Sequence, residues 1–408
     1  MQTNRRGFLG RAMGASAAVV AGGRLPAALL HAAEQAGGNS ERVLVVVQLS
    51  GGNDGLNTIV PYDNEIYYEQ RPQLAIPKND VLKIDDSLGF HPALRGFADL
   101  LESDRLAIVQ GVGYPNPNRS HFESMDFWHT CRRKTELRQE GWLGRSLKAL
   151  PAEGRSDIAA IHLGEKQQPL ALTSLGLPAA SLRSLDEFRL RLDDRSDLKS
   201  DIETLAAVER DAADDLLQFV QSSTTAALDA SARMTSAEKP YEPVRTYPAS
   251  ALGSRLETVS RLIDAGLGAR VYYLEVDGFD THAKQPDAHA GLLRQVGDAL
   301  SVFLDDIEAH GHGDRVVVMS FSEFGRRLAE NASEGTDHGM AAPLFLAGSP
   351  VRGGMVGTHP SLTDLHDGDL KHHTDFRQVY AALIERWFGC ESEGILGKAF
   401  APVDVLSV

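Results

Sequence analysis

Cysteine, positive charge and long apolar runs are all scarce in this sequence. Among 408 residues only Cys131 and Cys390 are cysteines, too few for a disulfide framework; they could pair with each other or remain separate buried thiols. A net charge of −15 at pH 7 argues against nucleic acid as a partner, because phosphates bind to a basic face. No stretch after the N-terminal segment approaches the ~20 apolar residues that span a bilayer, so no membrane span is expected in the processed chain.

The N-terminal segment has the pattern of a twin-arginine export signal. Arg5 and Arg6 stand before an apolar run rich in Ala and Gly at 12–33, which is too short for a comfortable membrane span. An amphipathic first helix is the alternative, but residues 13–23 carry no polar face. We therefore predict a cleaved signal at 1–36, the twin-arginine export machinery as a partner, and a folded protein in the periplasm or outside the cell.

The rest of the chain, 37–408, is long enough for one large α/β domain. Continuous apolar runs, rich in β-branched residues, are typical of strands buried on both faces of a mostly parallel sheet. Such runs lie at 42–49, 106–112, 269–276, 315–321 and 343–348. Helical segments are expected at 92–101, 121–130, 252–265, 288–310 and 375–387. The alternation predicts a doubly wound α/β fold with helices on both faces of the sheet.

The pattern weakens between residues 141 and 250. Residues 180–220 are charged and of helical character, and 222–250 are rich in Ser, Thr, Ala and Pro. We interpret the range 141–250 as a helical cap or insertion on the sheet, with an extended segment returning to it.

Polar side chains follow the predicted strands at the edge where ligands bind in open α/β sheets. Considered singly, each has an ordinary structural explanation. Asp54 and Asp337-His338 stand beside glycines and suit turns, and Asp280 with His282 could be solvated loop residues. Ser120 could cap the helix 121–130, with Glu123 completing a capping box.

Considered together, these residues point to a metal centre. Carboxylates and imidazoles at one edge suit a divalent ion, and mixed oxygen and nitrogen ligands favour zinc or manganese over magnesium or calcium. One or two ions per chain are expected, and two ions about 4 Å apart would clamp the attacking and leaving oxygens of a phosphate or sulfate ester. A serine at a helix N-terminus, as expected for Ser120, is well placed as a nucleophile.

At these residues the chain resembles a known family. Six motifs stand in series: Gly-Gly-Asn-Asp-Gly-Leu-Asn at 51–57, Arg-Ser-His-Phe at 119–122, Gly-Phe-Asp-Thr-His at 278–282, Ser-Glu-Phe-Gly-Arg at 322–326, Gly-Thr-Asp-His-Gly at 335–339 and Thr-Asp-Phe-Arg at 374–377. They resemble the exported family called domain of unknown function 1501, over nearly the whole mature chain. That family is similar to the alkaline phosphatase-like superfamily, which includes sulfatases and phosphodiesterases. The resemblance implies two metals and a Ser, Thr or formylglycine nucleophile.

The resemblance also assigns roles to individual residues. It implies that Ser120 is the nucleophile and that Arg119 or Arg326 neutralises remaining charge. The implied metal ligands are Asp54, Asp280, His282, Glu323, Asp337 and His338.

The chain departs from the superfamily pattern in three places. Glu323-Phe324 stands where relatives usually have Asp-His, Asp280 and His282 are two residues apart where four is common, and no Cys-x-Pro-x-Arg signature surrounds Ser120. The last departure disfavours formylglycine chemistry. Two hypotheses follow: an exported metal-dependent hydrolase of a small-molecule phosphate or sulfate ester, or a non-catalytic relative that binds a ligand or partner protein.

Overall fold

The computed structural model describes residues 42–151, 158–175, 177, 179–182 and 241–408. The expected signal at 1–36 lies outside these residues, as does the part of the expected insertion at 183–240. Within the described part of the chain, no helix is long and apolar enough to cross a membrane.

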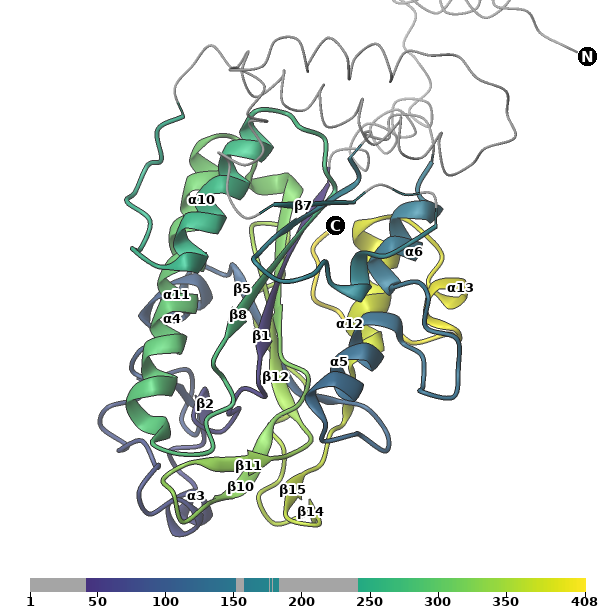
Figure 1. Ribbon diagram of the computed structural model, residues 1–408. Helices are drawn as coiled ribbons and strands as arrows, with labels where there is room; N and C mark the ends of the chain where they lie inside the picture. The colour runs from purple at the N-terminus through teal and green to yellow at the C-terminus, as the bar shows by residue number, and fades with distance from the viewer. Residues whose placement is uncertain (1–41, 152–157, 176, 178, 183–240) are drawn as a thin grey trace, which may run out of the picture. The chain divides into compact units, whose positions relative to one another are not determined.

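A sheet of nine strands lies at the centre of the described residues (Figure 1). The strand order is β13-β5-β12-β9-β1-β8-β6-β7, and β16 also pairs with β5. The bounds are β1 Val43–Ser50, β5 Leu106–Gly113, β6 Ala160–Leu163, β7 Ala179–Leu182, β8 Val271–Asp277, β9 Val316–Phe321, β12 Ala342–Ala347, β13 Gly354–Val356 and β16 Thr374–Asp375. Every pairing is parallel except those that β12 makes with β5 and β9. The five predicted strands and the mostly parallel sheet are confirmed.

Helices cover both faces of this sheet (Figure 1). Successive side chains of a strand point to opposite faces, so Val43, Val45 and Val47 of β1 pack in one apolar cluster, and Leu44 and Val46 in another. The first cluster is closed by α4 Arg95–Glu102, α10 Ala251–Asp264 and α11 Gln285–Ala309. The second is closed by α5 His121–Thr130, α6 Trp142–Ala149, α12 Phe376–Ala382 and α13 Glu393–Leu396. This is the doubly wound arrangement that the sequence predicted.

The range expected to be an insertion contains two strands of the central sheet. β6 pairs with β8, with Ile161 opposite Tyr272, and β7 pairs with β6. The α6 helix packs in the second apolar cluster, where Trp142 stacks on Tyr380 with ring centroids 3.8 Å apart. The described part of the expected insertion, up to Leu182, therefore contributes two strands to the central sheet. Strands of four residues carry too little periodicity to be recognised from sequence.

The strand β12 is antiparallel to its neighbours because a hairpin precedes it. After β9 the chain forms β10 (Arg326–Glu330) and β11 (Thr336–His338), which pair antiparallel. A parallel strand would need a longer crossover, usually a helix. The hairpin keeps the chain at the edge where β9 ends, and His338 consequently lies beside the segments that follow β8 and β9.

Smaller elements surround this edge of the sheet (Figure 1). They are β2 Ile59–Val60, α3 Glu65–Gln70, β3 Leu82–Lys83, β4 Gly89–Phe90, β14 Leu365–His366 and β15 Asp369–Leu370.

Candidate metal centre

The segments that follow β1, β8 and β9 meet closely at the carboxyl end of the sheet. Gly51 has a φ of +123°, and a Cβ atom there would lie 2.3 Å from the backbone nitrogen of Asp280. Gly52 has a φ of +79°, and its Cβ would collide with the ring of Phe324. Only glycine permits both this backbone conformation and this approach. The pair of glycines therefore brings the three strand ends together.

Three side chains converge at this point: those of His121, Asp280 and His338. One ligand atom from each lies within 4.8 Å of the other two. His282 lies against them, with its Nε2 atom 2.9 Å from Nε2 of His338 and 3.1 Å from Oδ1 of Asp280. We call these four residues the histidine–aspartate cluster. Its members come from the start of α5, from the loop after β8 and from the end of β11.

Each imidazole of the cluster is held through its other nitrogen. Nδ1 of His121 lies 2.8 Å from Oε1 of Glu323, and Nδ1 of His338 lies 2.8 Å from the carbonyl oxygen of Arg119. Nδ1 of His282 is 3.5 Å from a carboxylate oxygen of Asp337. Because a carbonyl oxygen can only accept, Nδ1 of His338 carries a proton, and its Nε2 atom faces the cluster, 3.1 Å from Oδ1 of Asp280.

This donor set fits a divalent metal ion. Imidazole nitrogens whose second nitrogen is anchored to a carboxylate or a carbonyl, together with one carboxylate, are the ligands that zinc and manganese sites use. Lone pairs of two Nε2 atoms 2.9 Å apart repel each other unless a proton or a cation lies between them. His121, Asp280 and His338, whose ligand atoms lie within 4.8 Å of one another, are therefore the residues that would hold the ion, and His282 contacts two of them.

Electrostatics keep Asp280 ionised. Partial burial opposes its charge, but hydrogen bonds from Arg326 and His338 outweigh burial and lower its pKa to about 2. The hydrogen bond to Glu323 raises the pKa of His121, whereas burial lowers the pKa of His338. The cluster thus offers a permanent carboxylate charge to a cation.

The side chain of Arg326 holds Asp280 and the backbone around the cluster in place. Its guanidinium, which is fully buried, donates to the carbonyl oxygens of Gly52, Thr336 and Phe279 at 2.6, 2.7 and 3.0 Å, and also to that of Gly51. A further bond of 2.7 Å reaches Oδ1 of Asp280. Since these bonds occupy the guanidinium, this geometry does not support the expected role of Arg326 in neutralising substrate charge, and Arg326 instead positions Asp280 and the surrounding backbone.

Glu323 also lies behind the cluster. It is 2% exposed, and its Oε1 atom accepts from the backbone nitrogen of Gly51 at 2.9 Å and contacts His121. Its Oε2 atom accepts from Ser322 at 3.0 Å. With both oxygens occupied, Glu323 orients His121, and its expected role as a direct ligand is not supported by this geometry. Asp337 occupies the equivalent position behind His282.

Asp54 lies in a different place from the cluster. It is completely buried and pairs with the equally buried Arg71 through a 2.6 Å contact, and Gln285 donates to the same oxygen at 2.6 Å. Burial opposes the ionisation of Asp54, yet Arg71 outweighs this effect and lowers the pKa. This geometry does not support the expected role of Asp54 as a metal ligand, because Arg71 already neutralises its charge.

Ser120 and Arg119 border the cluster at the surface. Ser120 occupies the N-cap position of α5, but its side chain makes no capping hydrogen bond, and Glu123 pairs with Arg138 instead of completing a capping box. The Ser120 side chain is exposed, one residue before His121. Arg119 contributes its carbonyl to His338, while its guanidinium binds Asp369 at 2.5 Å.

Sequence reasoning missed two residues of this region. His121 lies inside the Arg-Ser-His-Phe motif but was considered only as the start of a helix. Arg71 stands in a loop after α3, where nothing in the local pattern marks an arginine that becomes buried. The signal that could have identified His121 is its position directly after the candidate nucleophile Ser120. For Arg71 the sequence gives no such signal.

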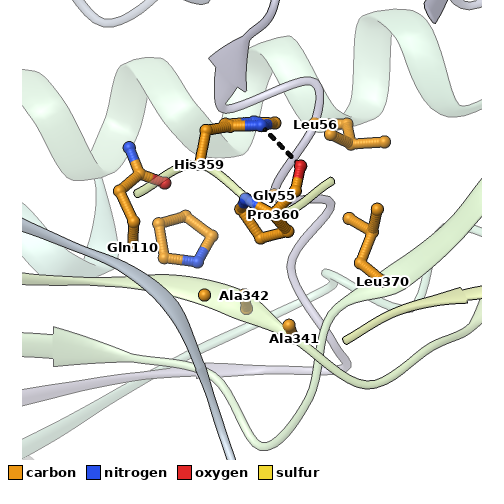
Figure 2. A pocket seen from close by; sticks show the side chains of 10 residues that line it. Gly55, Leu56, Gln110, Ala341, Ala342, His359, Pro360 and Leu370 are labelled. Atoms are coloured by element: carbon orange, nitrogen blue, oxygen red, sulfur yellow. Dashed lines mark hydrogen bonds between the residues drawn. The ribbon is translucent and has the colours of Figure 1, made fainter. Parts of the chain in front are cut away.

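A small pocket lies elsewhere along this edge (Figure 2). Its walls are mainly apolar, and Nδ1 of His359 is 3.0 Å from the carbonyl oxygen of Pro360. Its lining residues are Gly55, Leu56, Gln110, Gly111, Ala341, Ala342, Pro343, His359, Pro360 and Leu370. Since no member of the histidine–aspartate cluster is among them, we do not assign the chemistry to this pocket.

Comparisons with known proteins agree with the resemblance seen in the motifs. The model of a family described as protein of unknown function (DUF1501) matches residues 41–395. No curated protein matches the chain.

Solved structures similar to this chain include a lipoteichoic acid synthase from Listeria monocytogenes, 8% identical over 75% of this chain and 65% of that one, with a TM-score of 0.36. A protein of the alkaline phosphatase superfamily from Vibrio parahaemolyticus is 9% identical over 84% and 66% of the two chains, with a TM-score of 0.36. A sulfatase from Pseudoalteromonas is 11% identical over 89% and 71%, with a TM-score of 0.40. The chain spans less than two thirds of the length of the first of these.

Proposed function

Since the chain belongs to the DUF1501 family, whose description names no function, we propose a function from the site itself: a divalent-metal-dependent hydrolase that acts on a phosphate or sulfate ester outside the cytoplasm. The observation that carries the proposal is the histidine–aspartate cluster. The ligand atoms of two imidazoles and a carboxylate lie within 4.8 Å of one another, both imidazoles are held through their other nitrogen, and a third imidazole, that of His282, lies against them.

The cluster supports one metal ion per chain. A second ion would need further acidic ligands, but Asp54 is neutralised by Arg71, and Glu323 is occupied by His121, Ser322 and Gly51. A single bound ion would polarise the ester oxygen as a Lewis acid. This mononuclear arrangement differs from the pair of metals that the family resemblance implies.

The chain's own residues would supply binding and attack. Asp280, held ionised by Arg326, balances the charge of the cation. Ser120 is exposed beside His121 with its hydroxyl uncommitted to the helix, so it can approach an ester bound at the cluster. An attacking serine must lose its proton to a base in that step.

A non-catalytic metal-binding protein is the second candidate. The observation in its favour is that the guanidinium of Arg326 is consumed by the backbone and by Asp280. It therefore adds no cationic clamp to stabilise a transition state. Such a protein would use the cluster to bind a ligand or a partner without turning it over.

Metal binding and turnover separate these candidates. After treatment with a chelator, equilibrium dialysis against zinc or manganese should show about one bound equivalent, and His338→Ala should lose it while the fold stays intact. The matched control is His312→Ala, since His312 pairs with Asp264 away from the cluster. Turnover of an aryl phosphate or aryl sulfate that His338→Ala abolishes and His312→Ala preserves supports the hydrolase. Metal binding without turnover of any ester favours the second candidate, and failure to bind metal contradicts both.

Export is tested separately. Replacing Arg5 and Arg6 together with Lys should retain the precursor in the cytoplasm, because the export pathway recognises the paired guanidinium groups as an address. Normal accumulation of the double variant outside the cytoplasm would refute the twin-arginine assignment.

A further inference from the structure

Two arginines beside the metal centre share one buried carboxylate. Asp369 on β15 has a fully buried side chain. Its Oδ2 atom accepts from Nη2 of Arg119 at 2.5 Å, and its Oδ1 atom lies 3.4 Å from Nε of Arg327, with no hydrogen bond to that oxygen. We call Arg119 and Arg327 the arginine pair, and Asp369 is the carboxylate that they share.

Both guanidinium groups remain open to solvent. The side chains of Arg119 and Arg327 are 40% and 35% exposed. A guanidinium has about five N–H donors, and within the described residues Arg119 uses one nitrogen and the Arg327 side chain forms only its ion pair. Two positive charges flank the one buried carboxylate, and the carboxylate of Asp367 lies near enough to act on it electrostatically, in a chain of net charge −15.

The pair is anchored to the same backbone that builds the metal centre. The carbonyl oxygen of Arg119 holds Nδ1 of His338. Arg327 follows Arg326 on β10, and successive side chains of a strand point to opposite sides, so Arg326 faces the buried side and Arg327 the other. Hairpin β14–β15 lies beside β10 (Figure 1), and Asp369 on β15 thereby reaches Arg327 on β10. Neither guanidinium contacts a member of the histidine–aspartate cluster in the described contacts.

Stability alone does not explain this arrangement. Burying a carboxylate costs desolvation energy that an ion pair seldom recovers in full, and here one carboxylate oxygen lacks a hydrogen bond. What the carboxylate does achieve is to hold two exposed guanidinium groups side by side. Preorganised arginines bind planar or tetrahedral oxyanions through charge-assisted bonds.

We propose that Arg119 and Arg327 form a subsite for a second anionic group of the ligand, a sulfate, phosphate or carboxylate distinct from the group held at the metal. The inference rests on the proposed function for the reacting group, and on the arginine pair alone for the second group. It defines the substrate class as an ester with at least two negative charges.

Two binding experiments on the full chain test the subsite. The first titrates inorganic sulfate into metal-free protein by calorimetry at constant ionic strength, so that the cluster holds no cation. Arg119→Gln and Arg327→Gln should each weaken sulfate binding about tenfold, the loss expected for one charge-assisted interaction. Arg245→Gln is the matched control, since Arg245 is 53% exposed and pairs with Asp305, and it removes the same net charge.

The second experiment uses zinc-loaded protein and a series of ω-carboxyalkylphosphonates of increasing length, each compared with the alkylphosphonate that lacks the carboxylate. At least one length should bind about tenfold more tightly than its partner, and both arginine variants should remove that gain. The inference is overturned if wild-type protein binds no sulfate, if both variants bind it normally, or if no carboxylate at any length adds affinity. If the wild-type protein binds sulfate but does not bind zinc, the result counts against the proposed function and leaves the subsite standing.

Discussion

Replacing Arg71 with Met should destabilise the protein without changing its metal content. Arg71 donates to Oδ2 of Asp54 at 2.6 Å, to Oδ1 of Asn57 at 2.7 Å and to the carbonyls of Leu328 and Arg327 at 2.9 Å each. Without it, Asp54 keeps a charge in a fully buried position, where Gln285 donates to it at 2.6 Å and the backbone nitrogen of Asn57 at 3.4 Å. Breaking such a pair by removing one partner costs about 3–5 kcal/mol.

The pKa of Asp54 gives the sign of the pH dependence. Because the folded-state pKa is lowered by Arg71 against the opposing effect of burial, its stabilisation is present above the unfolded pKa of about 3.9 and is lost as the pH falls through the folded value. In Arg71→Met the carboxylate should instead prefer to be protonated, so the variant should recover part of its stability when the pH is lowered toward 5.

Urea unfolding of chelated protein measures these effects. The matched control is Arg95→Met: Arg95 is half-exposed and pairs with Asp99 and Glu102, so it should cost at most about 1 kcal/mol. Asp54→Asn should also be destabilised yet keep its full metal content. An Asp54→Asn protein that unfolds like wild type but loses metal would refute the reasoning, because Asp54 would then be a ligand. An Arg71→Met protein as stable as wild type would refute it as well.

Three further outcomes are expected. Glu323→Gln should weaken metal binding about 10–100-fold in chelator competition, since it removes the anionic partner of His121; unchanged affinity would show that His121 needs no such partner. Ser120→Ala should cut ester turnover by orders of magnitude with little change in melting temperature, because its hydroxyl caps nothing; near-normal turnover would exclude it as the nucleophile. Burial lowers the pKa of His129 to about 3, so the unfolded state binds more protons below pH 6.5 and stability falls as the pH drops. His129→Gln should remove about 2 kcal/mol of that fall between pH 7 and 5, and an unaltered slope in urea unfolding would contradict this.

The strands could be predicted because burial on both faces leaves a strong local signal. The run at 43–50 is apolar at nearly every position and lies between two parallel neighbours. The convergence of polar residues could also be predicted, since parallel strands deliver their carboxyl ends to one edge. Asp280, His282 and His338 were identified on that basis, and the structure brings them within contact distance.

What could not be predicted depends on contacts between distant residues. Asp54 has the sequence context of a ligand, and only the position of Arg71 makes it a structural ion pair. Glu323 stands directly after a strand, yet its carboxylate points to His121 and Gly51 and therefore supports a ligand instead of acting as one. Short strands such as β6 were missed because four residues give no measurable period. In each case the partner is remote in sequence and leaves no local pattern.

Arg326 has a consequence for how the metal centre arises during folding. Its guanidinium donates to Gly51 in the loop after β1, which lies 275 positions earlier in the chain, and to Phe279 in the loop after β8. Arg326 and His338 both lie on the β10–β11 hairpin, so a fragment that ends before this hairpin contains neither of them. Contacts so distant in sequence carry a large loop-closure entropy and form late. The cluster should therefore be absent from partly folded chains, and metal uptake should accompany the last cooperative step of folding, so that a bound ion raises the free energy of unfolding of the whole sheet by mass action.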